Sequence, residues 1–393
     1  MSEASQPGRH RQPPAPRAPG VHPVWPGRRG TLAALLIVAV GAAATVLVWR
    51  HLSGPGAAWL CRLDLRERLA QLLVVRFDGP VLAPDAETML RHQKVGGVVL
   101  YAKWGNVVDA AQLQALTAAL RAASAPPPLV AIDQEGGRVD RLVAVRGVRP
   151  AAAAVAAGGV AAAAAAGTED AHDLAQLGIA LNLAPVVDVE QVENAQLARR
   201  TFGRSPDQVA RLAGAYLGAL QRDGRVAGTL KHFPGLGGVR EDPHDETPRI
   251  AADRARLEAI DWQPFRTLIA DGDVAAVMVT HVFVDAIDPR HPASLSPALI
   301  EGVLRRDLGF DGVVIADALT MKGVASDAPL GEVALASLLA GTDLLMGPAS
   351  PQDVTAILDR LERAVAQREL SAARVDASVR RILALKARLG LLG

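Results

Sequence analysis

The chain of 393 residues is long enough for two average domains or for one barrel of the largest single-domain class. Half of its residues are hydrophobic and only 3% are aromatic, so Ala, Val and Leu are expected to pack the core. The net charge is +1, with +4 on residues 1–30 and −3 on the remainder, so the folded part has no basic footprint for nucleic acid. The single cysteine, Cys61, excludes an internal disulfide framework and a cysteine-based metal cluster.

An apolar segment near the N-terminus predicts a membrane span. Residues 31–49 contain no charged residue, and as a helix they would extend about 28 Å, close to the roughly 30 Å hydrocarbon core of a bilayer. Because the arginine-rich stretch precedes them, we expect a disordered basic cytoplasmic tail (1–30), a transmembrane signal anchor in the cell membrane (31–49), a linker (50–61) and an extracytoplasmic catalytic domain (62–393). A cleaved signal peptide stays open although no clear cleavage site follows. A lipoprotein stays open although the residues before Cys61 are not those expected at a lipidation site.

Beyond the linker, short apolar runs alternate with helical segments. The predicted strands are Leu72–Arg76, Gly97–Tyr101, Leu129–Ile132, Ala180–Val187, Val226–Leu230, Ala275–Thr280, Gly312–Ala316 and Asp343–Met346. The predicted helices are Ala110–Ala122, Ala151–Leu177, Asp207–Arg222, Arg254–Asp271, Pro297–Asp307, Leu330–Ala340, Gln352–Ala366 and Ala372–Leu389. Near-continuous apolar strands alternating with helices indicate a buried parallel sheet of the α/β class. Eight strands favour a closed (β/α)8 TIM barrel over an open sheet of seven or nine strands, which is the alternative.

Ionisable residues directly follow five of the predicted strands. They are Asp133 and Glu135, Asp188, Lys231 and His232, His281, and Asp317. Because a barrel places its active site at the C-terminal ends of its strands, these side chains are expected to converge on one mouth. Asp188 alone could be a helix cap, and His281 alone could be a buried core histidine. The convergence of all of them predicts an active site.

Six motifs occur in a fixed order along the chain. They are DQEGGRVDRL (Asp133–Leu142), LNLAPVVDV (Leu181–Val189), RRTFG (Arg199–Gly203), KHFPG (Lys231–Gly235), the Asp242-Pro243-His244 step and GFDGVVIADAL (Gly309–Leu319). Together they resemble the single-domain β-N-acetylhexosaminidases, or β-N-acetylglucosaminidases, of glycoside hydrolase family 3. The likeness covers residues 62–393.

The resemblance implies roles for individual residues. Asp317 is similar to the family nucleophile, His244 to the acid/base and Asp242 to the partner of that histidine. The positions that match sugar-binding residues of the −1 subsite are Asp133, Arg141, Arg200, Lys231 and His232. No metal and no other cofactor is expected, because His232, His244 and His281 lack the i, i+4 spacing of a helical zinc site and sugar transfer needs no ion.

These residue types suit retaining glycoside hydrolysis. Such an enzyme needs a carboxylate to attack the anomeric carbon and a second group to protonate the leaving oxygen. A histidine with a pKa near 6.5 can donate and accept protons at neutral pH, and an adjacent aspartate can fix its tautomer. Two positions depart from the family pattern, Leu236 in place of a second histidine and Pro243 in place of serine. Pro fixes φ and removes an N–H, so we expect changes in rate and loop mobility rather than in reaction type.

The expected function is that of a retaining exo-β-N-acetylhexosaminidase. It would release terminal N-acetylglucosamine from cell-wall (peptidoglycan) fragments through a covalent glycosyl-Asp intermediate. The expected partners are this glycan and the membrane, and we expect a monomer that does not bind nucleic acid. Two alternatives stay open: a catalytically impaired glycan-binding protein, and a β-glucosidase or xylosidase on the same barrel.

Overall fold

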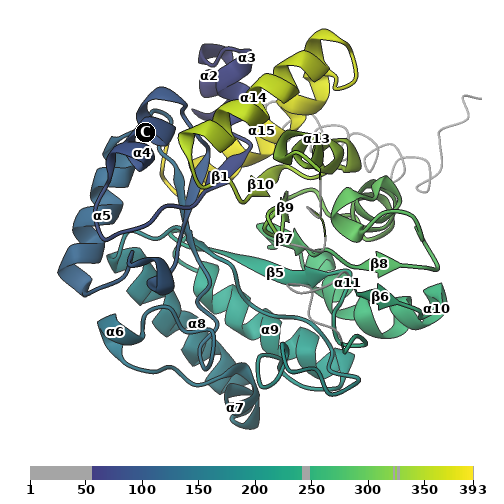
Figure 1. The fold of residues 1–393 in the computed structure, drawn as a ribbon. Coiled ribbons are helices and arrows are strands. Elements are labelled where there is room, and N and C mark those ends of the chain that lie inside the picture. The colour runs from purple at the N-terminus through teal and green to yellow at the C-terminus, as the bar shows by residue number, and fades with distance from the viewer. Residues whose placement is uncertain (1–54, 241–247, 322–323, 325–327, 393) are drawn as a thin grey trace, which may run out of the picture. The chain divides into compact units, whose positions relative to one another are not determined.

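A closed barrel of parallel strands forms the centre of the described protein. The computed structural model describes residues 55–240, 248–321, 324 and 328–392, which belong to one compact unit, His51–Gly393. In barrel order the strands are β1 (Leu73–Val75), β10 (Leu344–Met346), β9 (Val313–Ala316), β7 (Ala276–Val279), β5 (Ala227–Phe233), β4 (Leu181–Asn182), β3 (Leu129–Ile132) and β2 (Gly97–Leu100). Figure 1 shows them in the middle of the molecule, surrounded by helices. The predicted (β/α)8 barrel is confirmed.

All of the predicted apolar runs form barrel strands. Each strand is buried along its whole length, as a sheet covered by helices requires. β3 matches its predicted run, and five strands are one or two residues shorter than theirs. The remaining two, β4 and β5, differ more at their C-terminal ends. β4 ends at Asn182, two residues before a cis Ala184–Pro185 bond, and β5 continues to Phe233.

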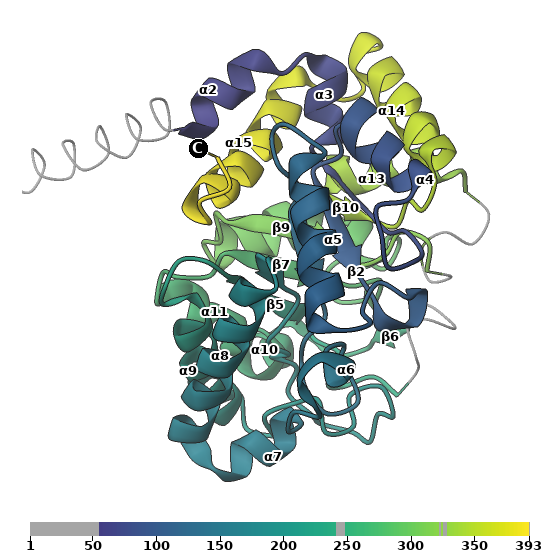
Figure 2. The same cartoon turned by 90° about the vertical axis from the view of Figure 1, so that its left-hand side faces the viewer.

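The helices form a layer outside the barrel (Figure 2). Their bounds are α5 (Ala110–Ala122), α7 (Ala152–Ala157), α8 (Gly159–Gln176), α9 (Pro206–Gln221), α10 (Arg254–Arg256), η3 (Leu257–Asp261), α11 (Gln263–Ala270), η5 (Ala298–Asp307), α13 (Leu330–Ala340), α14 (Pro351–Ala366) and α15 (Ala372–Arg388). The predicted helix Ala151–Leu177 is split because Gly159 adopts a φ of +69°, in the left-handed region that interrupts a right-handed helix. The predicted helix Arg254–Asp271 is divided near Pro264, which lies in the first turn of α11.

Shorter elements complete the fold. They are α2 (Pro55–Arg62), α3 (Leu65–Ala70), α4 (Pro84–Glu87), η1 (Thr88–His92), η2 (Ala102–Trp104), α6 (Val143–Arg146), η4 (Ala293–Leu295) and a separate two-stranded parallel sheet of β6 (Arg249–Ile250) and β8 (Phe283–Val284). Helix α2 lies within the segment predicted as a linker, and it packs against α15 at the other end of the described chain (Figure 2). The folded unit therefore includes residues before the predicted boundary at residue 62.

The predicted fold class is corrected in one respect, the transmembrane helix before the barrel. In the described ranges, no helix combines the length and the apolar character that crossing a bilayer requires. The segment predicted to span the membrane, residues 31–49, lies outside these ranges. The fold class of the described residues is the closed parallel barrel.

Candidate active site

A cavity of about 250 Å³ opens at the C-terminal ends of the barrel strands. Its walls include side chains at or just after the C-terminal ends of β2, β3, β5, β7, β9 and β10. All five residues predicted to bind sugar line it, together with the predicted nucleophile: Asp133, Arg141, Arg200, Lys231, His232 and Asp317. Residues after three of the five strands thus meet at one mouth as expected, whereas Asp188 and His281 do not line the cavity.

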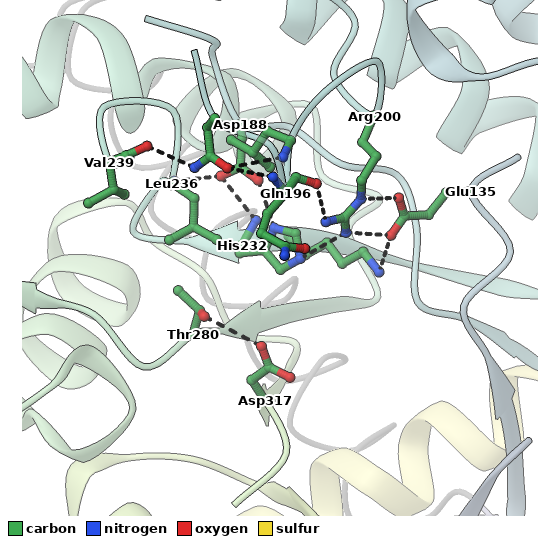
Figure 3. Close-up of polar contacts among 12 residues, drawn as sticks. Glu135, Asp188, Gln196, Arg200, His232, Leu236, Val239, Thr280 and Asp317 are labelled. Carbon is green, nitrogen blue, oxygen red and sulfur yellow. Dashed lines mark hydrogen bonds and ion pairs between the residues drawn. The ribbon is translucent and has the colours of Figure 1, made fainter. Parts of the chain in front are cut away.

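Four charged side chains on one wall form a compact network. The Lys231 Nζ donates to Asp133 Oδ1 at 2.7 Å and forms an ion pair with Glu135 Oε1 at 2.6 Å. Arg200 donates twice to the same glutamate, from Nε at 2.7 Å and from Nη2 at 2.8 Å (Figure 3). A bidentate arginine–carboxylate pair is strong and fixes the plane of both groups. The network therefore holds its donors and acceptors rigidly toward the cavity.

Charge pairing outweighs burial in this network. Burial by itself would raise the pKa of Glu135, but the charges of Lys231 and Arg200 hold that pKa well below its usual range. Burial also opposes ionisation of Asp133, yet the Lys231 charge lowers the pKa of Asp133. Burial would lower the pKa of Lys231, and the two carboxylates raise it instead. All members of the network are therefore charged at neutral pH.

An irregularity in β5 brings two consecutive residues to the same cavity. Leu230 pairs with Val277 and Phe233 pairs with Val279, so β5 contains one more residue than β7 between these pairs. A bulge of this kind re-aims side chains that would otherwise alternate between the two faces of a sheet. Both Lys231 and His232 consequently line the cavity. The peptide bond between them is cis.

His232 is fixed by Asp188, which follows β4. The Nδ1 of His232 lies 2.7 Å from Asp188 Oδ2, and its Nε2 lies 3.4 Å from Arg200 Nη2. Asp188 Oδ1 also accepts from the backbone N–H of Leu236 at 2.7 Å. Asp188 thus links the cavity-lining histidine to the start of the segment that follows β5.

Asp317 lies across the cavity from this network, immediately after β9 (Figure 3). Its Oδ1 accepts from the backbone N–H of Ala318 at 2.8 Å, and its Oδ2 accepts from Thr280 Oγ1 at 3.4 Å. The carbonyl of Ala318 lies 3.1 Å from His281 Nε2, and His281 Nδ1 lies 2.6 Å from Ser294 Oγ. The predicted nucleophile is therefore a half-buried carboxylate with both oxygens oriented by neighbours.

The predicted acid/base His244, its partner Asp242 and Pro243 lie outside the described residues. The segment leading to them is anchored beside the cavity. The Gly237 carbonyl accepts from the backbone N–H groups of Gln191 (2.9 Å) and Val192 (3.2 Å), and Asn194 Nδ2 donates to Val239 O at 2.8 Å. Leu236, one of the departures from the family pattern, is buried in the cavity wall.

Comparison with known proteins identifies the family of this chain. The family model for the glycosyl hydrolase family 3 N-terminal domain matches residues 64–385. The chain belongs to glycosyl hydrolase family 3. This membership confirms the resemblance inferred from the ordered motifs, and the protein is a glycoside hydrolase.

Several relatives of this family 3 hydrolase carry the name β-hexosaminidase. That of Tolumonas auensis is 38% identical over 299 residues, which cover 75% of this chain and 88% of the relative. That of Alkalilimnicola ehrlichii is 37% identical and covers 74% of this chain and 84% of the relative. The aligned regions therefore span most of this chain and most of each relative.

Solved structures of family 3 proteins have the same fold. A β-N-acetylglucosaminidase from Paenibacillus sp. str. FPU-7 is 37% identical with a TM-score of 0.80, over 84% of this chain and 63% of that longer chain. The M tuberculosis protein LpqI is 34% identical with a TM-score of 0.76, over 84% of this chain and 96% of that chain. The barrel of this hydrolase is therefore a common family architecture.

The cavity of the family 3 hydrolase contains residues to which the motifs assigned no role. Glu135 and Asp188 follow predicted strands, and this position in the sequence is the feature that points to a role in the site. Their ion pairs with Arg200 and His232 are seen only in the structure. Thr280 and Tyr101 were interpreted as the last residues of apolar strands. Both line the cavity, where Thr280 contacts Asp317 and Tyr101 contacts Arg141. Within the described ranges, no group of three His, Cys, Asp or Glu side chains could hold a metal ion.

Proposed function

We propose that this glycoside hydrolase is a retaining exo-β-N-acetylhexosaminidase in which Asp317 forms a covalent glycosyl intermediate. The observation that carries the proposal is the placement of Asp317 opposite the Asp133–Lys231–Glu135–Arg200 network in one cavity. The oxygens of Asp317 are oriented by Ala318 and Thr280, so one lone pair can face an anomeric carbon. Retention requires such a carboxylate within reach of the sugar.

The network opposite Asp317 suits recognition of a sugar ring in the −1 subsite. Asp133 is an ionised acceptor, and Lys231, Arg200 and His232 present nitrogen atoms to the same cavity. Sugar hydroxyls both donate and accept, so a wall that offers both kinds of group can orient the ring. Arg141 on the adjoining wall completes the proposed subsite.

His244 is the proposed proton donor, with Asp242 as its partner. Support comes from the segment leading to it, which is tied beside the cavity through Leu236, Gly237 and Val239. A histidine can protonate the leaving oxygen and later deprotonate water. Asp242 would hold the imidazole in the required tautomer and stabilise its charged form.

N-Acetylglucosamine is the proposed sugar, because the relatives are called β-hexosaminidases and β-N-acetylglucosaminidases. We propose cell-wall fragments as the source, in which the aglycone is an acidic sugar. Arg138 lines the cavity and forms no ion pair with a carboxylate of the described residues. A cation of this kind favours an aglycone with a carboxylate.

A chromogenic N-acetylglucosaminide tests the proposed reaction. Wild-type protein should hydrolyse it, with the β-anomer of N-acetylglucosamine as the first product seen by NMR. Asp317→Asn should reduce kcat by about 10³-fold or more, since the nucleophile is lost. Asp311→Asn is the matched control, because this exposed aspartate precedes the same strand and lies outside the cavity lining. Initial release of the α-anomer, or full activity of Asp317→Asn, would disprove the mechanism.

Substrate comparison separates this function from the alternatives. Binding of N-acetylglucosamine without turnover would favour a glycan-binding protein, and faster cleavage of plain glucosides or xylosides would favour those activities. For the aglycone, kcat/KM on a disaccharide of N-acetylglucosamine and N-acetylmuramic acid should exceed that on neutral chitobiose. In Arg138→Ala the ratio of the two kcat/KM values should be closer to one. Equal rates on both disaccharides would contradict the acidic aglycone.

A further inference from the structure

Four side chains beside the cavity form a stack in which two adjacent aromatic rings lie between two cations. Arg141, after β3, lies over the ring of Tyr101, with its guanidinium carbon 4.7 Å from the ring centroid. Tyr101, at the end of β2, lies against Trp104 with ring centroids 4.3 Å apart and planes inclined by 42°. Arg76, after β1, covers Trp104 at 4.8 Å. Consecutive strands of the barrel thus contribute to one wall, which we call the Arg141–Arg76 stack.

The stack holds Arg141 differently from the other arginine of the sugar site. Arg200 uses Nε and Nη2 on Glu135 and Nη1 on the carbonyl of Gln196. The Arg141 side chain has no hydrogen bond or ion pair with the described residues, and its Nε is buried without a partner. A cation–π contact uses the face of the guanidinium and leaves its in-plane N–H groups free. Arg141 is therefore held in place while its donors stay available to a ligand in the cavity.

Tyr101 and Asp133 line the same cavity. The charge of Asp133, together with burial, raises the pKa of Tyr101, so the phenol stays protonated at neutral pH. The ring that contacts Arg141 is therefore that of a neutral phenol.

Hydrogen bonds of its backbone fix the position of Tyr101. Its backbone N–H donates to Asn106 Oδ1 at 3.0 Å. Asn106 is fully buried, and its Nδ2 donates to the carbonyls of Phe77 (3.1 Å) and Gly79 (2.9 Å) in the segment after β1. The Gly79 N–H in turn donates to the carbonyl of Trp104 at 2.7 Å. These bonds tie the segments after β1 and β2 together and restrict movement of the rings.

We infer that Tyr101 is a positioning residue of this hydrolase, whose ring orients Arg141 toward the sugar. The inference rests on the proposed function, because it assigns Arg141 to the −1 subsite. The ring contributes to substrate affinity only through Arg141.

Two substitutions separate the contributions of the hydroxyl and the ring. Tyr101→Phe removes the hydroxyl, and the further change to Tyr101→Leu removes the ring. Each is made in the wild type and in Arg141→Met, and kcat and KM are measured with the chromogenic N-acetylglucosaminide. The KM of Tyr101→Leu should exceed that of Tyr101→Phe by about 3- to 30-fold when Arg141 is present, the range expected for a cation–π contact. When Arg141→Met is also present, the KM values of Tyr101→Leu and Tyr101→Phe should differ by less than about 2-fold.

The matched control is Trp59→Leu, which removes a ring under Arg62 (5.4 Å) on helix α2, away from the cavity lining. It should leave KM unchanged. If the KM ratio of Tyr101→Leu to Tyr101→Phe is the same with Arg141 and with Arg141→Met, the ring only fills space and the inference is wrong. If Tyr101→Leu lowers the melting temperature, the comparison between the two backgrounds still decides, since a purely structural loss affects both. If the wild type neither hydrolyses the substrate nor binds N-acetylglucosamine, the proposed function fails and the inference with it.

Discussion

Lys386 shows how strongly the surroundings of one side chain can alter its chemistry. This residue of α15 is fully buried, and its Nζ donates to Gln71 Oε1 at 2.7 Å. No carboxylate of the described residues forms an ion pair with it. Burial lowers the pKa of Lys386 from 10.5 to about 7. A buried ammonium without a counter-ion is costly, so the neutral amine is favoured in the folded state.

We predict that Lys386 makes the stability of the protein depend on pH above neutrality. The folded state loses this proton near pH 7 and the unfolded state near 10.5. Between these values the unfolded state binds more protons, so the free energy of unfolding rises with pH by up to about 1.4 kcal/mol per unit. Below pH 7 both states hold the proton and this dependence vanishes.

Denaturant unfolding at several pH values between 7 and 10 measures this dependence. In Lys386→Met the rise attributed to the lysine should disappear, whereas Lys94→Met, at a partly exposed lysine, should keep it. The test concerns the slope with pH, because losing the bond to Gln71 adds a constant offset. Identical slopes for the wild type and Lys386→Met would show that burial does not shift this group.

At the scale of elements, the segment after β5 depends on a close backbone approach. A Cβ on Gly237 would lie 1.7 Å from the Val189 carbonyl oxygen and 2.5 Å from the carbonyl carbon. Real atoms cannot approach so closely, and the obstacle is backbone rather than a flexible side chain. Neighbouring Gly238 is different, because its nearest atoms belong to the side chain of Gln191 at 3.7 Å or more.

We therefore predict that substitution of Gly237 lowers activity and that substitution of the adjacent Gly238 does not. Gly237→Ala should displace the segment that leads to His244 and lower kcat/KM by about 10- to 100-fold, since small misplacements of catalytic groups are costly. Gly238→Ala should stay within about 2-fold of the wild type, as an exposed substitution without a clash. Steady-state kinetics and melting temperatures of both variants check this. Equal activities would mean that the approach of Gly237 to Val189 does not position the segment.

At the scale of the described molecule, the first and last helices of the described residues, α2 and α15, pack against each other. A Cβ on Gly56 of α2 would lie 3.3 Å from backbone and side-chain atoms of Leu383 in α15, so the two helices approach closely. Leu60 of α2 is buried, and Trp59 packs against the core. Helix α2 therefore adds apolar burial to the fold although it precedes the first barrel strand.

We predict that α2 stabilises the barrel without contributing to catalysis. A chain beginning at Leu63 should melt about 2 to 6 °C below a chain beginning at Gly54, because it loses the burial of a leucine and part of a tryptophan. Its kcat at 25 °C should be unchanged, since no residue of α2 lines the cavity. Calorimetry and the chromogenic assay measure the two quantities. Equal melting temperatures would place the domain boundary at residue 62.

The sequence alone determined the barrel and the family. Apolar runs such as Val313–Ala316 and helices such as Ala110–Ala122 are local patterns, and their periodicity survives in any tertiary context. The polar residues after the strands, with Asp317 among them, could be assigned to one mouth because parallel strands end at the same side of a barrel.

Only the tertiary structure decided which of these residues act together. Glu135 and Arg200 are 65 residues apart in sequence and meet through two hydrogen bonds, and Asp188 meets His232 across 44 residues. Tyr101 could be interpreted from sequence only as the end of an apolar strand, yet it contacts Arg141 from the next strand. Hydropathy and spacing record where a side chain lies along its own element. Barrel closure sets the partners, because it brings together strand ends that are distant in the chain.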